Sequence, residues 1–368
     1  MLFLGAAANY KAKDILRHTF SFATKQSFDD LKMHLALRYK TNYDNVVLYH
    51  TGRSALCAGI KATTPKNSKV LINGFTCHAV LEAVKTAGCI PIFADISPDT
   101  LHFDAKTLRQ IYTKHPDLKT IIIQNSLGIP VDITAIERFA NIHNLTIIED
   151  LAHCTGVRYP DGREVGTVGK VAALSFGKSK SIDTISGGVL VVRDSSVKTP
   201  KQPTQRPQLS DSLRDRWYPF FGACMRGARH LKLHKIVTGI LLKLHFIEKS
   251  ADAKLSLNTR LTYWQAKLAL RQFNKLPSKG RKPIRKHYLV QNREKLLQSF
   301  RAQGFFFDEL WYDTPVSPAR YYAKVHFPEK ECPNSVKISQ EIINLPTYYT
   351  QADLAPAIKI IKDHQNDR

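Results

Sequence analysis

Two short polar segments follow neighbouring β-branched runs and contain the residues best suited to chemistry. Glu149–His153 (EDLAH) comes directly after one run, and Ser175–Lys180 (SFGKSK) comes directly after the next. Ser186–Gly188 (SGG) follows the lysines, and Thr51–Ser54 (TGRS) opens a helical stretch far upstream. Taken singly, an acid at a strand end is more often a helix cap, and a lysine is more often a surface charge. Their order along the chain favours a catalytic arrangement over these simpler interpretations.

A strand-end acid, a lysine after the next strand and a glycine pair are the parts that a pyridoxal-phosphate (PLP) enzyme needs. A carboxylate beside the pyridine nitrogen raises the pKa of that nitrogen, so the protonated ring can withdraw electrons from a substrate carbon. The lysine forms a Schiff base with the coenzyme and later moves a proton, which requires a neutral amine for part of the cycle. Amide groups at the start of the helix near Gly52 would bind the coenzyme phosphate.

These segments lie in a repeating pattern of strands and helices between residues 45 and 194. The predicted strands are Val70–Asn73, Pro91–Ala94, Thr120–Gln124, Thr146–Glu149, Val171–Ser175 and Val189–Val192. The predicted helices between them are Ser54–Ala62, His78–Ala87, Asp104–Thr113 and Ile133–His143. Such spacing is typical of parallel βαβ units and predicts an α/β fold with helices on both faces of the sheet. Ligands of such sheets bind beyond the carboxyl ends of the strands, where Asp150 and Ser175 lie.

Four regions are expected along the chain. They are an N-terminal segment (1–44), a large coenzyme-binding domain (45–195), a linker with a basic amphipathic insertion (196–250) and a small C-terminal α+β domain (251–368). Asp194–Leu213 is polar and contains three prolines, which predicts an exposed connection. Helices are predicted at Leu261–Leu276 and Ile284–Arg301, and a helix–strand–helix end finishes with Leu354–His364.

The balance of charge is the unusual feature of the composition. The 368 residues include 54 Lys and Arg against 31 Asp and Glu, a formal net charge of +23. This surplus favours anionic partners, namely phosphorylated small molecules, an acidic membrane surface or nucleic acid. Nucleic acid is disfavoured because no helix-turn-helix or zinc module is visible. The six cysteines form no CxxC pair, so we expect no metal site and no disulfide framework. No apolar run reaches the length of a spanning helix, and the N-terminal residues lack a basic leader, so we expect a cytoplasmic protein, at most peripheral on a membrane.

The chain resembles the DegT/StrS-type sugar aminotransferases, which are PLP enzymes of fold type I. The segments that carry the resemblance, in family order, are His50–Leu56, Gly74–Asp104, Leu127–Ile133, Ile147–Tyr159, Val165–Ile182, Ser186–Gly188, Leu257–Leu270 and Cys332–Tyr349. The resemblance implies a mostly parallel central sheet flanked by helices, a smaller C-terminal domain and PLP as the coenzyme. It also implies transfer of an amino group from glutamate to a keto-sugar, carried on a nucleotide diphosphate, for polysaccharide or glycoconjugate biosynthesis.

The resemblance also implies roles for individual residues. Lys180 falls at the position of the Schiff-base lysine, Asp150 at that of the pyridine-nitrogen partner, and His153 at that of a side chain that contacts the ring or its 3-hydroxyl. Lys178 is a rival for the Schiff base, although the register from both Ser175 and the glycine pair favours Lys180. The coenzyme-binding residues are expected to be Gly52, Arg53, Ser54, Cys77, His78, Asp150, His153, Ser175, Lys180 and Asn258.

Asn258 matches an asparagine that reaches the phosphate of the neighbouring subunit in the family, which implies a homodimer with shared active sites. Arg53 is either a ligand of a phosphate or diphosphate, or a surface charge at the start of a helix, and we weigh the two equally. Many relatives place an aromatic ring on the coenzyme near the position of Cys77. Here either His78 stacks on the ring instead, or the ring packs against a smaller neighbour.

Two further departures from the family leave the function open. The Gly-Glu-Gly-Gly motif of the family is Ile185–Gly188 (ISGG) here, without the acid. Loss of this glutamate would be consistent with a catalytically altered protein that acts at a membrane surface, in assembly or in regulation. The lysine at the Schiff-base position argues against a dehydratase. Leu231–Ile247 has apolar residues near helical spacing with basic residues mostly off that stripe. Such a helix either rests on an anionic membrane or packs against the large domain or a dimer partner, and packing is the commoner case.

Overall fold

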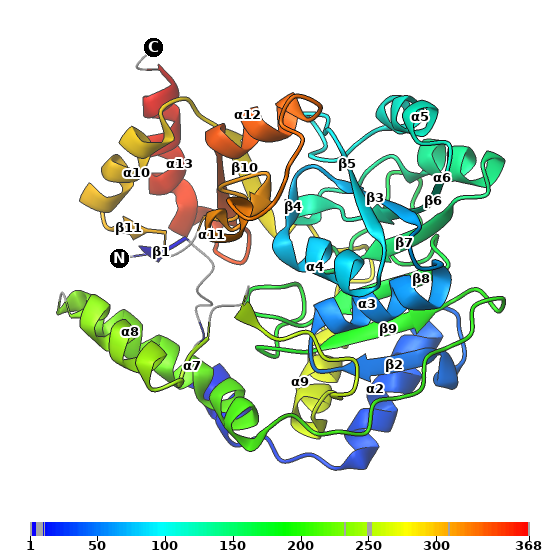
Figure 1. The fold of residues 1–368 in the computed structure, drawn as a ribbon. Coiled ribbons are helices and arrows are strands. Elements are labelled where there is room, and N and C mark those ends of the chain that lie inside the picture. Colours follow the sequence, from blue (N-terminus) through cyan, green and yellow to red (C-terminus); the bar gives the residue numbers. More distant parts are fainter. Residues whose placement is uncertain are drawn as a thin grey trace.

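The computed structural model describes residues 2–4, 10, 12–231, 233–248, 252–307 and 310–366 (Figure 1). A seven-stranded sheet in the order β2-β9-β8-β7-β6-β3-β5 lies at its centre. The strands are β2 (Val46–Tyr49), β3 (Lys69–Asn73), β5 (Ile90–Ala94), β6 (Leu118–Ile123), β7 (Thr146–Asp150), β8 (Val171–Ser175) and β9 (Gly188–Val192). Only β9 in this sheet runs antiparallel to its neighbours, so the prediction of a mostly parallel α/β sheet is confirmed.

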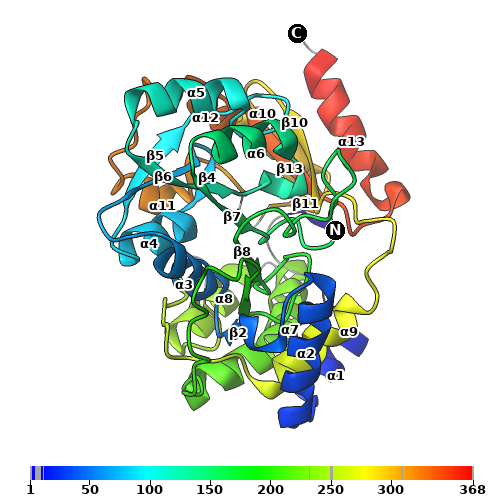
Figure 2. The same ribbon diagram turned by 90° about the vertical axis from the view of Figure 1, so that its right-hand side faces the viewer.

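Helices cover both faces of the sheet because its strands are apolar on both sides. Alternate residues of β2 join opposite cores, with Val46 and Leu48 in one and Val47 and Tyr49 in the other. One face is covered by α3 (Gly52–Thr63) and α4 (His78–Thr86). The other face, where α2 and α9 lie side by side in Figure 2, is covered by α2 (Lys25–Arg38), α5 (Ala105–Lys114), α6 (Ile133–Ile142) and α9 (Tyr263–Phe273).

A second, smaller core is formed by C-terminal elements. Strand β10 (Arg285–Leu289) pairs antiparallel with β13 (Ile342–Pro346), next to α10 (Arg293–Ala302), α12 (Pro333–Glu341) and α13 (Gln351–Asn366). The N-terminal strand β1 (Leu2–Phe3) joins this part by pairing with β11 (Phe305–Phe306). The prediction of one helix over Ile284–Arg301 is therefore wrong in its first half. Pairing with β13 holds this half extended, and the helix begins only after Asn292, whose side chain accepts the Lys295 N–H.

The predicted insertion forms two helices, α7 (Leu209–His230) and α8 (His234–Lys243), beside the short helix α1 (Ala12–Thr19). Figure 1 shows the pair at one side of the molecule. The exposed connection that the prolines predicted ends at residue 208, because α7 begins four residues before Leu213. The predicted boundary at residues 250 and 251 lies outside the described residues.

The remaining short elements lie between these layers. They are η1 (Tyr43–Asn45), β4 (Thr76–Cys77), η2 (Ser126–Gly128), β12 (Val316–Ser317) and α11 (Ala319–Tyr322), with β4 and β12 paired in parallel. Within the part of the chain that the structure describes, no helix combines the length and the apolar character that crossing a bilayer would require.

Three segments that are distant in sequence converge at the start of α3. A Cβ atom on Gly188 would lie 2.3 Å from the Thr51 carbonyl oxygen and 2.6 Å from the Gly52 Cα. A Cβ atom on Gly52 would in turn lie 2.5 Å from the Cβ of Ser175. Both positions therefore require glycine, and this close approach brings the ends of β8 and β9 against the N-terminus of α3.

We expect Gly188→Ala to lower the free energy of unfolding by about 1–3 kcal/mol, since the added methyl group meets backbone that cannot move without shifting α3. Gly239→Ala, in α8, is the matched control because its methyl group would meet no atom within 4 Å. Its stability should be unchanged or slightly raised. Urea denaturation of both variants measures the difference, and equal stabilities would contradict the close approach.

Candidate active site

Glu149 and Asp150 are neighbours in β7, point to opposite sides of the strand and have different roles. Glu149 is fully buried and accepts the backbone N–H groups of Gly166, Val168 and Gly169 at 2.6–2.8 Å, as well as the Tyr159 hydroxyl at 2.7 Å. These bonds satisfy the carboxylate and hold the loop before β8 in place. Glu149 is thus a structural acid, and Asp150 is the acid at the end of the strand.

The Asp150 carboxyl is buried, with 8% of the residue exposed. Its Oδ1 accepts the Ala152 N–H at 3.0 Å. Burial raises the pKa of this carboxyl to about 6, although the Ala152 hydrogen bond and the positive charge of Lys180 act in the opposite direction. A carboxylate at this place is costly unless a cation lies beside it, which is the condition that a protonated ring nitrogen meets.

Lys180 and His153 are in direct contact, with 2.7 Å between Lys180 Nζ and His153 Nε2. The Leu127 N–H donates to the other ring nitrogen, Nδ1, at 3.2 Å. Burial lowers the pKa of His153 well below its ordinary value, and the charges of Lys180 and Arg285 lower it further. A neutral ring whose Nδ1 accepts a hydrogen bond has its proton on Nε2. His153 therefore donates to Lys180, and this contact favours the neutral amine.

The rival lysine lies in a different environment. Lys178 donates from Nζ to the Glu248 carbonyl oxygen and sits 4.0 Å from the centre of the Tyr218 ring. Burial lowers the pKa of Lys178 to about 8, against the opposing effect of Asp215 and Glu248. Between the two lysines, Ser179 has a φ of 62°, which turns the chain. Of the two amines, only that of Lys180 is hydrogen-bonded to His153, so the geometry favours Lys180 as the coenzyme-binding residue.

An aromatic and cationic column covers this cluster from the C-terminal part. The Trp311 ring stacks on His153 at 4.9 Å and lies 4.7 Å from Lys180 Nζ. The buried Arg285 guanidinium lies 4.3 Å from the centre of the same ring, and its Nη1 donates to the Asn344 Oδ1 at 3.0 Å. Burial lowers the pKa of Arg285 to about 10. Sequence analysis missed Trp311 and Arg285 because no local pattern connects them with residues more than 100 positions upstream.

The expected phosphate site has a cradle shape that suits a small anion. Thr51 caps α3, since its Oγ1 accepts the Ser54 N–H at 3.2 Å. The Ser54 hydroxyl bonds to Thr51 at 2.8 Å and accepts the Ser256 N–H at 3.0 Å, so it supports the cap. Gly52 leaves no room for a side chain beside Ser175, as shown above. The helix N-terminus supplies amide donors at this bare backbone, and a phosphate-bearing coenzyme fits these residues.

Three other expected coenzyme ligands lie around α4 and α3. Arg53 is buried and forms an ion pair with Glu82 of α4, so the interpretation of Arg53 as a surface charge is wrong. The His78 ring stacks on Tyr321, with 4.1 Å between the ring centres and 14° between the ring planes. Cys77 is half-buried and lies directly before α4, at its N-cap position.

Asn258 is exposed and lies on the far side of β2 from the sheet core. Its backbone oxygen accepts the Gln205 N–H at 3.2 Å, and the next residues bridge to β2 through Arg260 and Tyr49. Among the described residues, no hydrogen bond joins its side chain to Asp150, His153 or Lys180. The structure therefore does not bring Asn258 into the cluster of its own chain.

The α7 helix contributes an acid that sequence analysis did not identify. Asp215 is buried and accepts the Ser186 hydroxyl at 2.5 Å, and its Oδ2 lies 3.7 Å from His50 Nε2. Burial raises the pKa of Asp215, while His50, the Ser186 hydrogen bond and nearby cations lower it. A carboxylate thus lies against Ser186, the position at which the Gly-Glu-Gly-Gly motif has its acid. No signal in the sequence connects two residues 29 positions apart across a linker.

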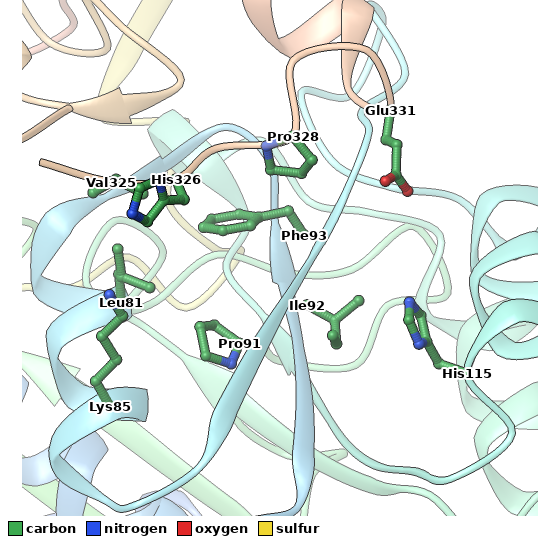
Figure 3. A pocket seen from close by; sticks show the side chains of 10 residues that line it. All are labelled: Leu81, Lys85, Pro91, Ile92, Phe93, His115, Val325, His326, Pro328 and Glu331. Carbon is green, nitrogen blue, oxygen red and sulfur yellow. The ribbon is translucent and has the colours of Figure 1, made fainter. Parts of the chain in front are cut away.

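A cavity of about 250 Å³ lies at the edge strand β5. Figure 3 shows the side chains that line it. It is lined by residues that include Leu81, Pro91, Phe93, His115, His326 and Glu331, and by none of the predicted site residues. Within the described ranges, no group of three His, Cys, Asp or Glu side chains is arranged to hold a metal ion. The candidate site is therefore the cluster of Asp150, His153 and Lys180 with the cradle at Gly52.

We expect Asp150→Asn to change how the stability of the coenzyme-free protein depends on pH. Between the ordinary carboxyl pKa of 3.8 and the folded value of about 6, the unfolded chain ionises at Asp150 and the folded chain does not. Wild-type stability therefore falls as the pH rises through this window. The variant does not lose this stability, because asparagine has no carboxyl group to ionise. Its stability relative to wild type should rise by about 2 kcal/mol from pH 4 to pH 7 in urea denaturation. Asp132→Asn, at an exposed helix cap, is the control. The same pH dependence of stability in Asp150→Asn and Asp132→Asn would contradict the burial of Asp150.

Comparisons with known proteins agree with this geometry. The model of the DegT/DnrJ/EryC1/StrS aminotransferase family matches residues 35–361. An L-glutamine:2-deoxy-scyllo-inosose aminotransferase of Streptomyces kanamyceticus is 30% identical over 145 residues, which are 39% of this chain and 33% of the relative. A GDP-perosamine synthase of Caulobacter vibrioides is 32% identical over 154 residues, which are 42% of this chain and 40% of the relative. These matches thus span two-fifths or less of the length of each relative.

Solved structures show the same fold over nearly the whole chain. A DegT DnrJ EryC1 StrS aminotransferase from Brucella abortus has a TM-score of 0.66 at 20% identity and covers 93% of this chain and 91% of its own. The PLP form of a sugar aminotransferase, Spr1654, from Streptococcus pneumoniae has a TM-score of 0.68 at 17% identity and covers 97% of both chains. The fold type I architecture and the predicted resemblance are confirmed, and the chain belongs to the DegT/DnrJ/EryC1/StrS aminotransferase family.

Proposed function

We propose that the protein is a PLP-dependent aminotransferase that moves an amino group onto a keto-sugar. The observation that carries this proposal is the contact between Lys180 and His153 beside the buried carboxyl of Asp150. A neutral amine next to a partly protonated buried acid is costly to maintain for stability alone, and such perturbed groups gather at functional sites. Membership of an aminotransferase family supports the same activity.

The residues present match the parts of PLP. Bound PLP would supply a ring that withdraws electrons from the substrate. The Asp150 carboxylate would pair with the ring nitrogen, and the gain in charge pairing would offset the desolvation that raises its pKa. Gly52 and Ser175 would hold the phosphate, and Lys180 would hold the coenzyme covalently. The Lys180 Nζ would also accept and return the substrate proton, for which the His153 hydrogen bond favours the neutral amine.

We propose glutamate as the amino donor and a keto-sugar on a nucleotide diphosphate as the acceptor, in polysaccharide or glycoconjugate biosynthesis. The net charge of +23 supports a substrate that carries a diphosphate. The names of the relatives support a sugar or cyclitol acceptor, since one names GDP-perosamine and another 2-deoxy-scyllo-inosose. One of these names also contains L-glutamine, so glutamine is the donor to test beside glutamate.

The active unit in this proposal is a cytoplasmic homodimer with shared sites. The exposed position of Asn258, at a segment that bridges to β2, supports it, because this side chain is directed to the surface and not to its own cluster. An asparagine there would reach the coenzyme phosphate of the partner subunit, which makes each site depend on both chains.

We expect Lys180→Ala to abolish covalent PLP attachment and Lys178→Ala to retain it, because only Lys180 lies at the His153 contact. Borohydride reduction followed by peptide mass spectrometry reports the attached lysine, and the visible absorbance of bound PLP reports occupancy. Addition of glutamate should bleach the absorbance of wild type and of Lys178→Ala. Attachment at Lys178 in wild type would reverse the assignment, and a wild type that does not bind PLP would support a non-catalytic scaffold.

The shared site can be tested by mixing two inactive variants. Lys180→Ala and Asn258→Ala should each lose most of the glutamate-dependent amination of a panel of nucleotide-linked keto-sugars. Coexpressed chains should recover about a quarter of wild-type activity, because half of the dimers are mixed and each of these has one intact site. Coexpression of Lys180→Ala with Asp150→Ala is the control and should stay inactive, since both residues belong to the same chain's cluster. Equal activity of the two mixtures would refute a shared site.

A further inference from the structure

The outer face of helix α8 is apolar and exposed to solvent. Leu233, Ile236, Ile240 and Leu244 have 47–61% of their surface exposed. Their spacing of three or four residues places them along one side of the helix, which we call the α8 stripe. A helix at a protein surface ordinarily turns such a stripe toward the core, so the α8 stripe faces the wrong way for a purely structural role.

The helix does not need the α8 stripe in order to fold against its neighbour. Leu241 and Ile247 are buried, and they supply the inward contacts of this segment. Phe246, which follows α8, stacks on Phe221 of α7 at 5.1 Å and 25°. Two sides of the hairpin are therefore apolar, and the inner side already accounts for its packing.

The same segment has a strong excess of positive charge. Residues 216–247 include six Lys and Arg and no Asp or Glu. Arg216 and Arg226 are turned inward and donate to the carbonyl oxygens of Ser21 and Tyr10. Lys235 and Lys243 are exposed, while Lys232 lies outside the described residues. At 3.6 residues per turn, Lys243 borders the α8 stripe and Lys235 lies about a quarter turn further round the helix on the same side. The outer face of the hairpin thus combines apolar side chains with lysines along one side.

An anionic lipid surface fits this combination better than other partners. Apolar side chains enter the boundary between headgroups and acyl chains, while flanking lysines pair with the phosphates. A second copy that paired hairpin to hairpin would bring its own Lys235 and Lys243 close to the same lysines of the first copy. Nucleic acid would pair with the lysines but leave the α8 stripe in water. We propose that the α7–α8 hairpin docks the protein on anionic membranes through the α8 stripe, Lys235 and Lys243.

The hairpin is connected to the candidate active site at its base. The Ser186 hydroxyl donates a hydrogen bond to Asp215 of α7. Lys178 Nζ donates a hydrogen bond to the backbone carbonyl oxygen of Glu248, which follows α8. Both contacts involve the segment that contains Lys180. Docking through the hairpin therefore fixes the orientation of the candidate site relative to the membrane surface.

Sedimentation with vesicles tests the proposal without any measurement of activity. The full-length protein should bind vesicles of equal parts phosphatidylglycerol and phosphatidylcholine, bind phosphatidylcholine alone weakly, and lose affinity as salt rises. Ile236→Ser with Ile240→Ser should lower partitioning to the anionic vesicles at least tenfold. Lys235→Gln with Lys243→Gln should lower it about 30-fold, which corresponds to about 1 kcal/mol for each lysine.

Matched pairs elsewhere on the surface distinguish a specific face from diffuse charge. Leu37→Ser with Ile142→Ser removes apolar residues of comparable exposure from α2 and α6, and Lys295→Gln with Lys330→Gln removes two exposed lysines. Both control pairs should bind as wild type does. The proposal fails if the controls and the hairpin variants lose binding equally, or if wild type does not bind anionic vesicles. It also fails if the Ile236 and Ile240 changes split a dimer in sedimentation velocity and leave vesicle binding intact, which would assign the α8 stripe to a second copy.

Discussion

The candidate site depends on one buried carboxyl group, that of Asp150 at the end of β7. Burial disfavours its charge, so the surroundings must supply either a proton or a cation. Lys180 is the nearby cation that lowers its pKa, yet the hydrogen bond from His153 favours the neutral form of the same lysine. Without a ligand, the chain meets both demands only when Asp150 carries a proton. A cationic ring bound beside Asp150, as the proposed coenzyme would provide, would let the acid ionise while the amine stays neutral.

The rest of the fold holds this arrangement in place from several directions. Glu149 fixes the loop before β8, and glycines at 52 and 188 allow three segments to meet at the start of α3. Trp311 covers His153 and is held in turn by Arg285, which bonds to Asn344 of β13. The C-terminal elements thereby complete a site whose reactive residues lie at the ends of β7 and β8 or in the segments that follow them. This distribution agrees with sheets whose ligands lie beyond the carboxyl ends of parallel strands.

Much of the central sheet was predictable because its signals are local. Runs such as Val171–Ser175 are short, β-branched and bounded by turns, and their observed limits agree with those expected. The strand at Val46–Tyr49 was not among the predicted runs, and β9 is antiparallel because no helix separates it from β8. The prediction of a helix from Ile284 was wrong because an amphipathic pattern with charged residues is also compatible with an edge strand. Only the pairing with β13 decided between helix and strand.

The amino-acid sequence by itself determined which residues stand at the strand ends, and so that Asp150, His153 and Lys180 would meet. Parallel strands place their carboxyl ends along one edge, which converts order along the chain into proximity. The tertiary structure alone decided what surrounds them. Arg285, Trp311 and Asp215 approach from distant segments, and the different surroundings of Lys178 and Lys180 separate two otherwise similar lysines. Such contacts depend on the packing of one element against another. The periodicity of a sequence does not show which distant elements will pack together.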